Sequence, residues 1–581
     1  MSFPPGLAYL FRNLPNLLLP PAVVLVANLA VREMYGLIVP IWLFTLACIF
    51  SFPLALFVVV QWTDYVDRRD AAAHGAVLPP IVKAKLIAGL DILLEQKRTF
   101  QRKLIADMLF DFSETYGNIF IRRVFYENKV FTSEPEHIKI VLATHFPGFE
   151  KGQSFRGQMQ SLLGTGVFNS DGEMWKFHRA MTRPFFSRDR IRHFEIFDRH
   201  VDDAFKQMRA RLSEGYAVDW QDLVSRFTMD SATEFLFGQD VRSLSAGLPY
   251  PPTSPLSQQR AHPSDRFSRS FFGAQLQSAL RSRFLGIWPL FEFWEDQVKK
   301  HVVAIDDFIK PVLENALREK DQKKDQGVDD TTLLEHLVNL TDDSQIIQDE
   351  ILNILLAGRD TTAATLTFAV YKLAQHPHIL RRLRQEVLAE VGTSRRPTHD
   401  DIREMKFLRA FINETLRLYP PVPFNFRSTI KGTVLPSMIP GEKPYFLPAN
   451  TRFQYSVFVM HRRKDLWGPD ALEFDPDRFL DQRLHKYLTP NPYIFLPFNA
   501  GPRICLGQQF AYNEVSFMLV RLLQQFVGVK LALEASPGSL PPPGFVDSRG
   551  SNGEDEVLFT THLTMYVKDG LWLRMDDATA C

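Results

Sequence analysis

A glycine-rich segment near the C-terminus constrains this chain most: residues 498–507 read Phe-Asn-Ala-Gly-Pro-Arg-Ile-Cys-Leu-Gly. It contains Cys505, one of only three cysteines, between Gly501 and Gly507 and two positions after Arg503. A helical pattern over residues 508–525 follows directly. Glycines let a backbone approach a flat group closely, and the positive end of a helix favours a thiolate over a thiol. The segment therefore indicates a tight loop that offers a sulfur ligand to a metal.

A free cysteine is more often buried and inert, so the specificity of the pattern matters. Phe-x-x-Gly-x-Arg-x-Cys-x-Gly fixes five positions, which makes a chance match rare. Iron of haem held by a cysteine thiolate is the known chemistry of this type. The segment resembles the haem-binding loop of the cytochrome P450 family. The resemblance implies haem b as cofactor, Cys505 as the axial ligand of its iron, and Phe498 and Arg503 beside it. It also implies a mainly α fold with small β-sheets.

Length and composition agree with a large enzyme body. The chain has 581 residues, 45% of them hydrophobic, which is enough for a sizeable core. Its net charge of +1 gives no indication of a nucleic-acid partner. Cys48, Cys505 and Cys581 do not form a disulfide framework, which favours a reducing compartment for the body.

The N-terminal region has the composition of a membrane anchor. Residues 34–63 contain no charged side chain, and residues 37–60 are almost wholly apolar. As a helix, that stretch would reach about 36 Å, against a hydrocarbon core of about 30 Å. It predicts a transmembrane helix and is too long for a cleaved signal peptide. The preceding apolar residues 14–31 are interrupted by Pro15, Pro20 and Pro21. They predict an interfacial or re-entrant segment, or the first half of a hairpin.

The chain is thus divided into an anchor region, residues 1–63, a polar and proline-containing linker, residues 64–80, and a haem-thiolate domain, residues 81–581. Arg32 precedes the main span, whereas Arg68 and Arg69 follow it. This small asymmetry favours a body on the cytosolic side. Together with the resemblance, it leads us to expect an endoplasmic reticulum membrane protein whose catalytic domain faces the cytosol.

Local patterns in the body predict further elements. Residues 119–132 read as strands of a small sheet. Residues 146–168, rich in Gly and Phe, read as a loop that is either a pocket wall or a simple connection. Residues 558–575 alternate around Lys568-Asp569-Gly570, which predicts a hairpin. Residues 541–556 have the composition of an irregular insertion.

The longest helical pattern runs from about residue 342 to 374 and stops before Pro377. Its middle is apolar all round and therefore buried, yet it contains Ala-Gly-Arg-Asp-Thr-Thr at residues 357–362. Such residues are costly inside a buried helix. Either they form an exposed turn with threonines bonded back to the helix, or Gly358 lets a ligand approach while Asp360 and Thr361 handle protons. The second interpretation resembles the central helix of cytochromes P450.

Two further patterns resemble the family's cofactor partners. Trp175 and Arg179 share a helix face at i and i+4, which is also typical of a surface aromatic–cation pair. The family places Trp-x-x-x-Arg beside a haem propionate, and Arg427 stands where it often places another propionate partner.

A third pattern resembles a structural network of the family. Glu414 and Arg417 at i and i+3 are ordinary on a surface helix. With Arg478 downstream, they resemble the Glu-x-x-Arg pair and its partner arginine beneath the haem loop. Asp477 stands where the family commonly has Glu.

The resemblance implies a membrane-bound haem-thiolate monooxygenase that inserts one oxygen atom of O2 into an apolar small molecule. Thr361, with Asp360 and water, would deliver protons as a general acid. Electrons would come from a separate NADPH-dependent flavoprotein reductase, and membrane lipid would be a second partner.

Residues 228–238 and 508–511 resemble fungal microsomal enzymes that hydroxylate long alkanes and fatty acids. Polycyclic aromatic or other xenobiotic compounds are the alternative substrates. Two other classes remain open: a haem-thiolate isomerase or peroxygenase, against which Thr361 argues, and a non-catalytic haem sensor.

Overall fold

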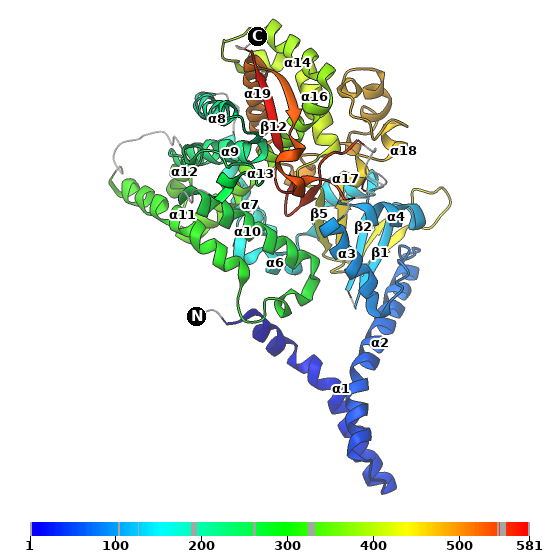
Figure 1. Ribbon diagram of the computed structural model, residues 1–581. Helices are drawn as coiled ribbons and strands as arrows, with labels where there is room; N and C mark the ends of the chain where they lie inside the picture. Colours follow the sequence, from blue (N-terminus) through cyan, green and yellow to red (C-terminus); the bar gives the residue numbers. More distant parts are fainter. Residues whose placement is uncertain are drawn as a thin grey trace.

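The computed structural model describes residues 3–102, 105–125, 127–186, 194–258, 263–322, 332–542, 545 and 554–578. It shows a helix-rich body with a two-helix projection at the N-terminus (Figure 1). Most of the predicted insertion, residues 541–556, lies outside the described residues, as does Cys581.

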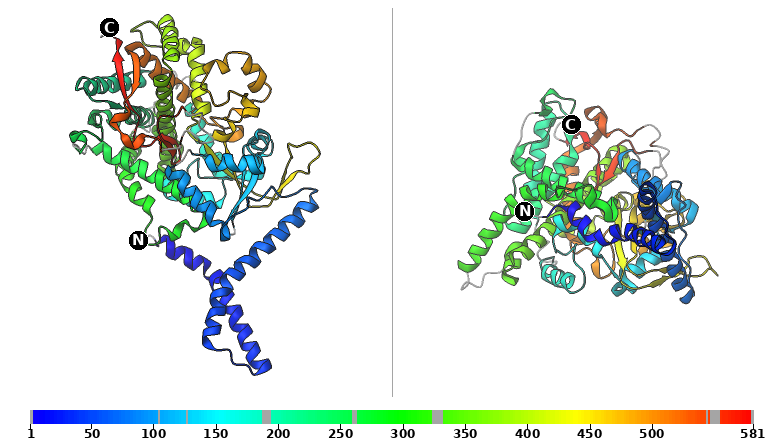
Figure 2. Two further views of the ribbon diagram at one scale, coloured as in Figure 1. Left: turned by 45° about the vertical axis from the view of Figure 1, so that its right-hand side comes forward. Right: turned by 90° about the horizontal axis from the view of Figure 1, so that it is seen from below.

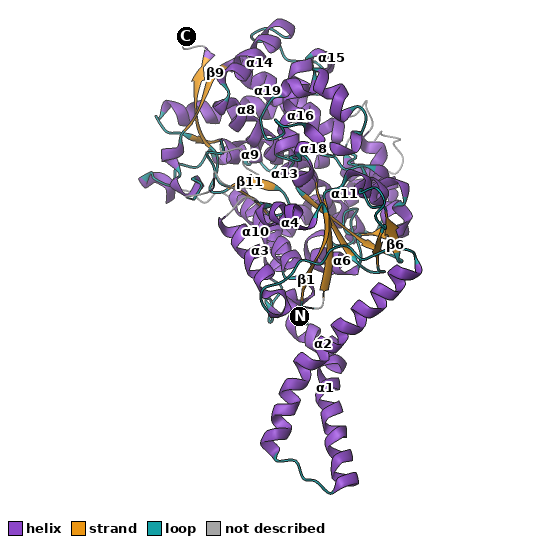
Figure 3. Ribbon diagram, turned by 90° about the vertical axis from the view of Figure 1, so that its right-hand side faces the viewer, coloured by secondary structure: helices purple, strands orange, loops and turns teal. Residues whose placement is uncertain are grey.

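Helices dominate the body, as the sequence predicted (Figure 3). In chain order they are α1 (Pro5–Tyr35), α2 (Ile41–Ala73), α3 (Leu90–Arg102), α4 (Asp107–Tyr116), α5 (Pro135–Lys139), α6 (Gln153–Leu163), α7 (Gly172–Thr182), α8 (Glu195–Ser213), α9 (Trp220–Phe237), α10 (Pro263–Arg283), α11 (Gln297–Gln322), α12 (Leu333–Leu340), α13 (Ser344–Gln375), α14 (Pro377–Glu390), α15 (His399–Glu404), α16 (Lys406–Leu418), α17 (Val457–Met460), α18 (Lys464–Trp467) and α19 (Gln508–Gln525).

The strands of the described residues form small sheets. They are β1 (Ile119–Val124), β2 (Glu127–Thr132), β3 (Phe149–Glu150), β4 (Val218–Asp219), β5 (Phe424–Thr429), β6 (Thr433–Leu435), β7 (Tyr445–Leu447), β8 (Arg452–Ser456), β9 (Phe526–Leu531), β10 (Phe559–Thr561), β11 (Met565–Val567) and β12 (Trp572–Asp577). The largest sheet has the order β1-β2-β8-β5-β3, in which only β2 and β8 run parallel. The others are β4-β12-β9, β10-β11 and β6-β7.

The N-terminal projection is a helical hairpin made by α1 and α2 (Figure 2). Both helices are long and apolar enough to cross a membrane, with mean hydropathies of 1.8 and 2.6. The proline-containing stretch that the sequence left undecided is thus helical, and the pair is consistent with a membrane anchor. Both ends of the hairpin touch the body, through Gly6 N–H to Phe293 O at 2.9 Å and Val77 N–H to Pro444 O at 2.9 Å.

Helix α2 differs from the predicted span at both ends. It begins at Ile41, after Pro40, and continues to Ala73. Polar residues 64–73, predicted as the first part of a linker, therefore extend the helix toward the body. The side chain of Asp64 explains part of this extension, because its Oδ2 accepts a hydrogen bond from Arg123 Nη1 of β1 at 2.9 Å. The division into anchor, linker and catalytic domain stays a prediction.

Two local predictions about the body are corrected by long-range packing. Residues 146–168 are not simply a loop, because α6 occupies Gln153–Leu163 and buries Met159 and Leu162. The turn at residues 568–570 reverses the chain as predicted, but its flanking strands do not pair with each other. Strand β11 pairs with β10, and β12 pairs with β9 and β4.

Helix α13 runs through the body and packs against α9, α16 and α19 (Figure 1). The Asp343 carboxylate caps it by accepting from the backbone N–H groups of Gln345 and Ile346, at 3.0 and 3.1 Å. Its predicted burial is confirmed, since nearly all side chains from Ile347 to Leu373 are inaccessible. The helix therefore brings residues 357–362 to the centre of the body.

Candidate active site

The loop around Cys505 is held close to the segment at residues 140–144. Gly501 has φ of +69°, and a Cβ there would lie 1.8 Å from Leu142 O. Only glycine fits this backbone and this approach. Asn499 also has positive φ, 65°, and its side chain accepts a hydrogen bond from Tyr455 OH at 2.8 Å. Cys505 N–H closes the loop by donating to Phe498 O at 3.0 Å.

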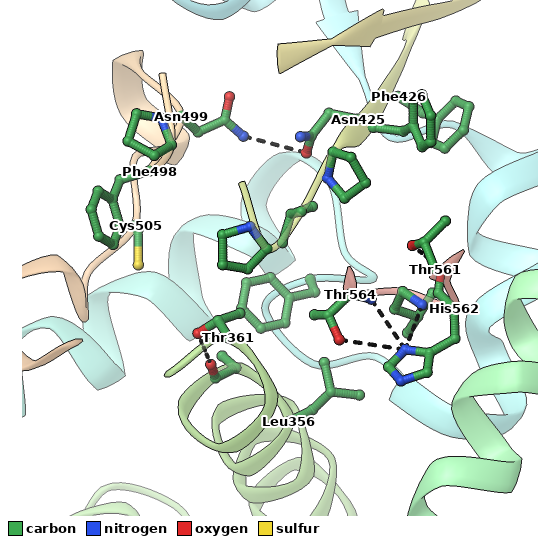
Figure 4. Close-up of a pocket in the computed structure, with 18 of the residues that line it drawn as sticks. Leu356, Thr361, Asn425, Phe426, Phe498, Asn499, Cys505, Thr561, His562 and Thr564 are labelled. Carbon is green, nitrogen blue, oxygen red and sulfur yellow. Dashed lines mark hydrogen bonds between the residues drawn. The ribbon is translucent and has the colours of Figure 1, made fainter. Parts of the chain in front are cut away.

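The Cys505 side chain is accessible from an internal cavity but lies deep in the protein (Figure 4). Burial raises the pKa of its thiol, and the Gly507 N–H and the Arg179 charge oppose this only in part. The positive end of α19, which the sequence argument invoked, therefore does not by itself make a thiolate. A metal cation at the sulfur would do so, because a coordinating thiol is deprotonated.

The cavity has a volume of about 500 Å³ and is bounded by helices, by β5 and by residues 560–564, which include the end of β10. Apolar side chains of α6, α9, α13 and α19 form much of its wall. The prediction that residues 146–168 form a pocket wall is confirmed, because Phe155, Met159 and Leu163 line it. No acidic side chain of the described residues lines the cavity, whereas these basic ones do: Arg122, Lys129, Lys151, Arg179, Arg283, Arg427 and Arg503.

Thr361 and Gly358 of α13 border the cavity, but Asp360 is not among its lining residues. Thr361 Oγ1 donates to Ala357 O at 2.7 Å, so this threonine is bonded back to its helix while still facing the cavity (Figure 4). The Asp360 carboxylate instead accepts from Arg359 Nη1 at 2.7 Å and from Gln275 Nε2. The two predicted proton-handling residues are therefore adjacent in sequence but face different surroundings.

Three arginines, together with Lys151, gather on the Cys505 side of the cavity. Arg503 donates to Asp171 Oδ1 at 2.8 Å, and Arg179 donates to Ile504 O at 2.8 Å, beside Cys505. Arg427 of β5 is buried, and its Nε has no hydrogen-bond partner in the described chain. Burial and the neighbouring Arg427 lower the pKa of Arg503 to about 10. The side chains of Arg179, Arg427 and Arg503 together could bind an anion. The Asp171 carboxylate neutralises only part of their positive charge.

The sequence argument missed Lys151, which lines the cavity in this cation group. Burial lowers its pKa well below the ordinary value, and the charges of Arg427 and Arg503 lower it further. Little in the sequence indicated this role, because a single lysine in a Gly- and Phe-rich stretch belongs to no recognisable motif. Trp175 of α7 completes the group, because the guanidinium groups of Arg503 and Arg179 lie 4.6 and 6.0 Å from its ring centroid.

Glu414, Arg417 and Arg478 meet in a buried network. Arg417 Nε and Nη2 donate to the two Glu414 carboxylate oxygens at 2.7 and 2.8 Å. Arg417 also donates to backbone oxygens of His461, Ala471 and Glu473. Arg478 Nε lies 3.5 Å from Glu414 Oε1, and all three side chains are essentially inaccessible. The network ties α16 to the segment that precedes the Cys505 loop.

Comparison with known proteins identifies the family. The sequence model described as Cytochrome P450 matches residues 88–546. The chain belongs to the cytochrome P450 family. The chain is 39% identical to Cytochrome P450 52A3-A of Candida maltosa, over 71% of this chain and 77% of that protein. It is 37% identical to Cytochrome P450 monooxygenase pvhE of Talaromyces variabilis (72% and 78%) and 34% identical to Cytochrome P450 52-E3 of Starmerella bombicola (83% and 91%).

Membership makes this P450 an oxidoreductase with haem b as cofactor. The residues present fit that group. The Cys505 side chain opens to the cavity, as a ligand to iron requires. The buried cations beside it, including the unpaired Nε of Arg427, suit the two propionates of haem. The predictions of the family, the fold class and the cofactor are confirmed.

Proposed function

We propose that this P450 monooxygenase hydroxylates long-chain fatty acids or alkanes. The observation that carries the proposal is the apolar cavity of about 500 Å³ that contains both Cys505 and Thr361. A largely apolar wall recognises an aliphatic chain by burying its surface rather than by hydrogen bonds. The likeness of residues 228–238 and 508–511 to alkane- and fatty-acid-hydroxylating enzymes supports the same substrate class.

The predicted cofactor residues would hold haem, with Trp175 stacked against the guanidinium groups of Arg503 and Arg179. Cys505 would ligate the iron, and Phe498, which lines the cavity beside it, would pack against the macrocycle. Arg179, Arg427 and Arg503, with Lys151, would bind the propionates. Bound haem supplies the activation of O2 and the insertion of one oxygen atom into a C–H bond.

Thr361 is the residue best placed to deliver a proton. Its hydroxyl donates to Ala357 O, so it must rotate away from that oxygen before it can donate into the cavity. The Asp360 carboxylate binds Arg359 and Gln275, and its charge acts on His562, which lines the cavity. The structure thus favours Thr361 Oγ1, rather than the Asp360 carboxylate, as the last proton donor.

The surface beside the N-terminal hairpin supports an orientation of the body on a membrane. The exposed aromatic residues Phe291 and Trp294 lie next to Phe293, which contacts the start of α1. Aromatic residues of this kind favour the membrane–water interface. We infer that this face rests on lipid of the endoplasmic reticulum, with the body on the cytosolic side where Arg68 and Arg69 lie. A membrane-bound NADPH-dependent flavoprotein reductase would supply electrons there.

Turnover of the purified protein with a microsomal reductase, NADPH and O2 tests the function. Fatty acids and alkanes should give hydroxylated products that depend on both reductase and NADPH. Turnover restricted to polycyclic aromatic compounds would contradict the substrate class. Product formation with peroxide but never with reductase would contradict the monooxygenase cycle.

A further inference from the structure

Three basic residues stand in direct register across adjacent strands of the largest sheet. Arg122 of β1 pairs with Lys129 of β2, and Lys129 pairs with Arg452 of β8. Residues directly opposite in neighbouring strands point to the same face, so the three side chains form one row. Like charges in such positions repel each other and destabilise a sheet. A row of this kind requires a compensating interaction.

The protein compensates this repulsion only in part, through the charge of Glu127 and the Phe426 ring, whose centroid lies 4.6 Å from the Arg452 guanidinium. The side chains are buried, with exposed fractions of 4% for Arg122, 7% for Lys129 and 7% for Arg452. Within the described residues, no carboxylate forms an ion pair with any of the three side chains. The charge of Glu127 acts on Lys129 and Arg452 from a distance. Its carboxylate accepts a hydrogen bond from Gly286 N–H at 3.0 Å. Among the residues that the structure describes, Arg122 Nε and Arg452 Nε and Nη1 find no hydrogen-bond partner. Burial lowers the pKa of both arginines to about 10.

Neighbouring polar groups nevertheless hold the row in place. Arg122 donates to the Gln454 side chain. Arg452 Nη2 donates to Ser282 Oγ at 2.9 Å and to Gln158 Oε1 at 3.3 Å. The site is therefore built from the sheet, α6 and α10. In the described part of the chain, the N–H groups of Arg122 Nε and of Arg452 Nε and Nη1 remain available to a ligand.

Two members of the row, Arg122 and Lys129, face the cavity that contains Cys505, and the row is separate from the cations assigned to haem. Arg427 projects from the opposite face of the sheet, because it follows Phe426, which pairs with Gln454 on the face of the row. Strands lie ~4.8 Å apart, so β2 is roughly 10 Å and β1 roughly 14 Å from β5. The two propionates of haem do not account for this second group.

We propose that Arg122 and Lys129, with Arg452 adding its positive charge beside Lys129, bind the carboxylate of a long-chain fatty acid while its hydrocarbon chain extends through the cavity toward Cys505. The inference rests on the proposed function and narrows it to acids over alkanes. A carboxylate accepts several charge-assisted hydrogen bonds and neutralises the row. Because β8 separates β1 and β2 from β5 and its Arg427, carbons next to the carboxylate should not reach the oxidising centre, and hydroxylation should fall toward the other end of the chain.

The test compares hexadecanoic acid with hexadecan-1-ol, which has the same length but no charge. Spectral titration of the haem-loaded protein gives both dissociation constants. Lys129→Met should weaken binding of the acid by about tenfold to hundredfold and change binding of the alcohol less than about twofold, as expected for loss of a charged hydrogen bond. It should also raise Tm, because it removes repulsion and a buried charge. Lys129→Arg should retain the preference for the acid.

Arg123→Met, on the adjacent strand β1, is the matched control for Lys129→Met. Arg123 is adjacent to Arg122 but points to the other face, where it pairs with Asp64 and Asn128. This variant should lower Tm and leave the acid-to-alcohol ratio unchanged. The proposal is overturned if Lys129→Met lowers Tm as Arg123→Met does, or leaves the ratio unchanged.

The same titration distinguishes failure of the proposed carboxylate site from failure of the proposed function. If the protein binds the alcohol and hexadecane but not the acid, the proposed carboxylate site is wrong. The proposed oxidation of long aliphatic chains would then still stand. Failure to bind any of the three compounds would overturn both.

Discussion

Arg417→Met should destabilise the body strongly, because it opens the buried network that ties α16 to the segment before the Cys505 loop. The substitution leaves the Glu414 carboxylate without its bidentate partner, and breaking a buried ion pair costs about 3–5 kcal/mol. Three backbone oxygens also lose their donor, at about 1–3 kcal/mol each. The lower ends of these ranges together give about 6 kcal/mol.

This loss converts into a measurable shift in Tm. The unfolding entropy of about 2.1 cal/mol/K per residue gives roughly 1.2 kcal/mol/K for 581 residues. Differential scanning calorimetry of the haem-loaded protein should therefore show a decrease in Tm of about 5 °C. Haem content per purified chain should fall in parallel, since α16 and the segment before the loop are no longer tied together.

Arg382→Met is the matched control, because Arg382 also makes a bidentate pair with a carboxylate. It contacts Asp477 at 2.7 and 2.9 Å, but the two side chains are 50% and 40% exposed. Exposed pairs contribute about 0–1 kcal/mol, so Tm should change by about 1 °C or less. Equal shifts for the two variants would refute the claim that burial makes the Arg417 network essential.

Three further substitutions test separate parts of the account. Gly501→Ala should abolish haem incorporation, because its Cβ would lie 1.8 Å from Leu142 O; Gly157→Ala, whose Cβ meets open space, should not, and equal haem content would contradict the steric argument. Burial raises the pKa of Glu514 to about 8 from 4.5, so the native state binds more protons and its stability falls as pH rises through this window. Glu514→Gln should flatten that slope in urea unfolding at pH 5 to 8, and an unchanged slope would assign it to other groups. Thr361→Ala should lower product per NADPH oxidised severalfold; normal coupling would remove Thr361 from proton delivery.

The parts of the site that the sequence predicted are those encoded locally. Cys505, Arg503 and Phe498 belong to one short loop whose spacing is set by backbone geometry. Glu414 and Arg417 are neighbours on one helix turn, so their contact follows from the i, i+3 spacing. Joining Arg478 to them required the family pattern, because α17 and α18 intervene.

The parts that the sequence did not predict depend on contacts between distant segments. The row on β1, β2 and β8 exists only because the parallel pairing of β2 with β8 brings Arg452 beside Lys129. The hairpin prediction failed for the same reason, because β12 finds a longer partner in β9 than it would in β11. Asp360 was predicted to handle protons with Thr361; its carboxylate accepts from Gln275 of α10 and does not line the cavity, a contact that the sequence did not indicate, and its catalytic role stays a prediction.

The carbon monoxide spectrum of the reduced protein tests most directly that Cys505 is the thiolate ligand of the haem iron. The wild-type protein should show the red-shifted Soret band of a thiolate-bound haem. Cys48→Ala, which changes a cysteine of the N-terminal hairpin, should retain it. Cys505→Ala should lose the band, and a retained band in that variant would contradict the assignment.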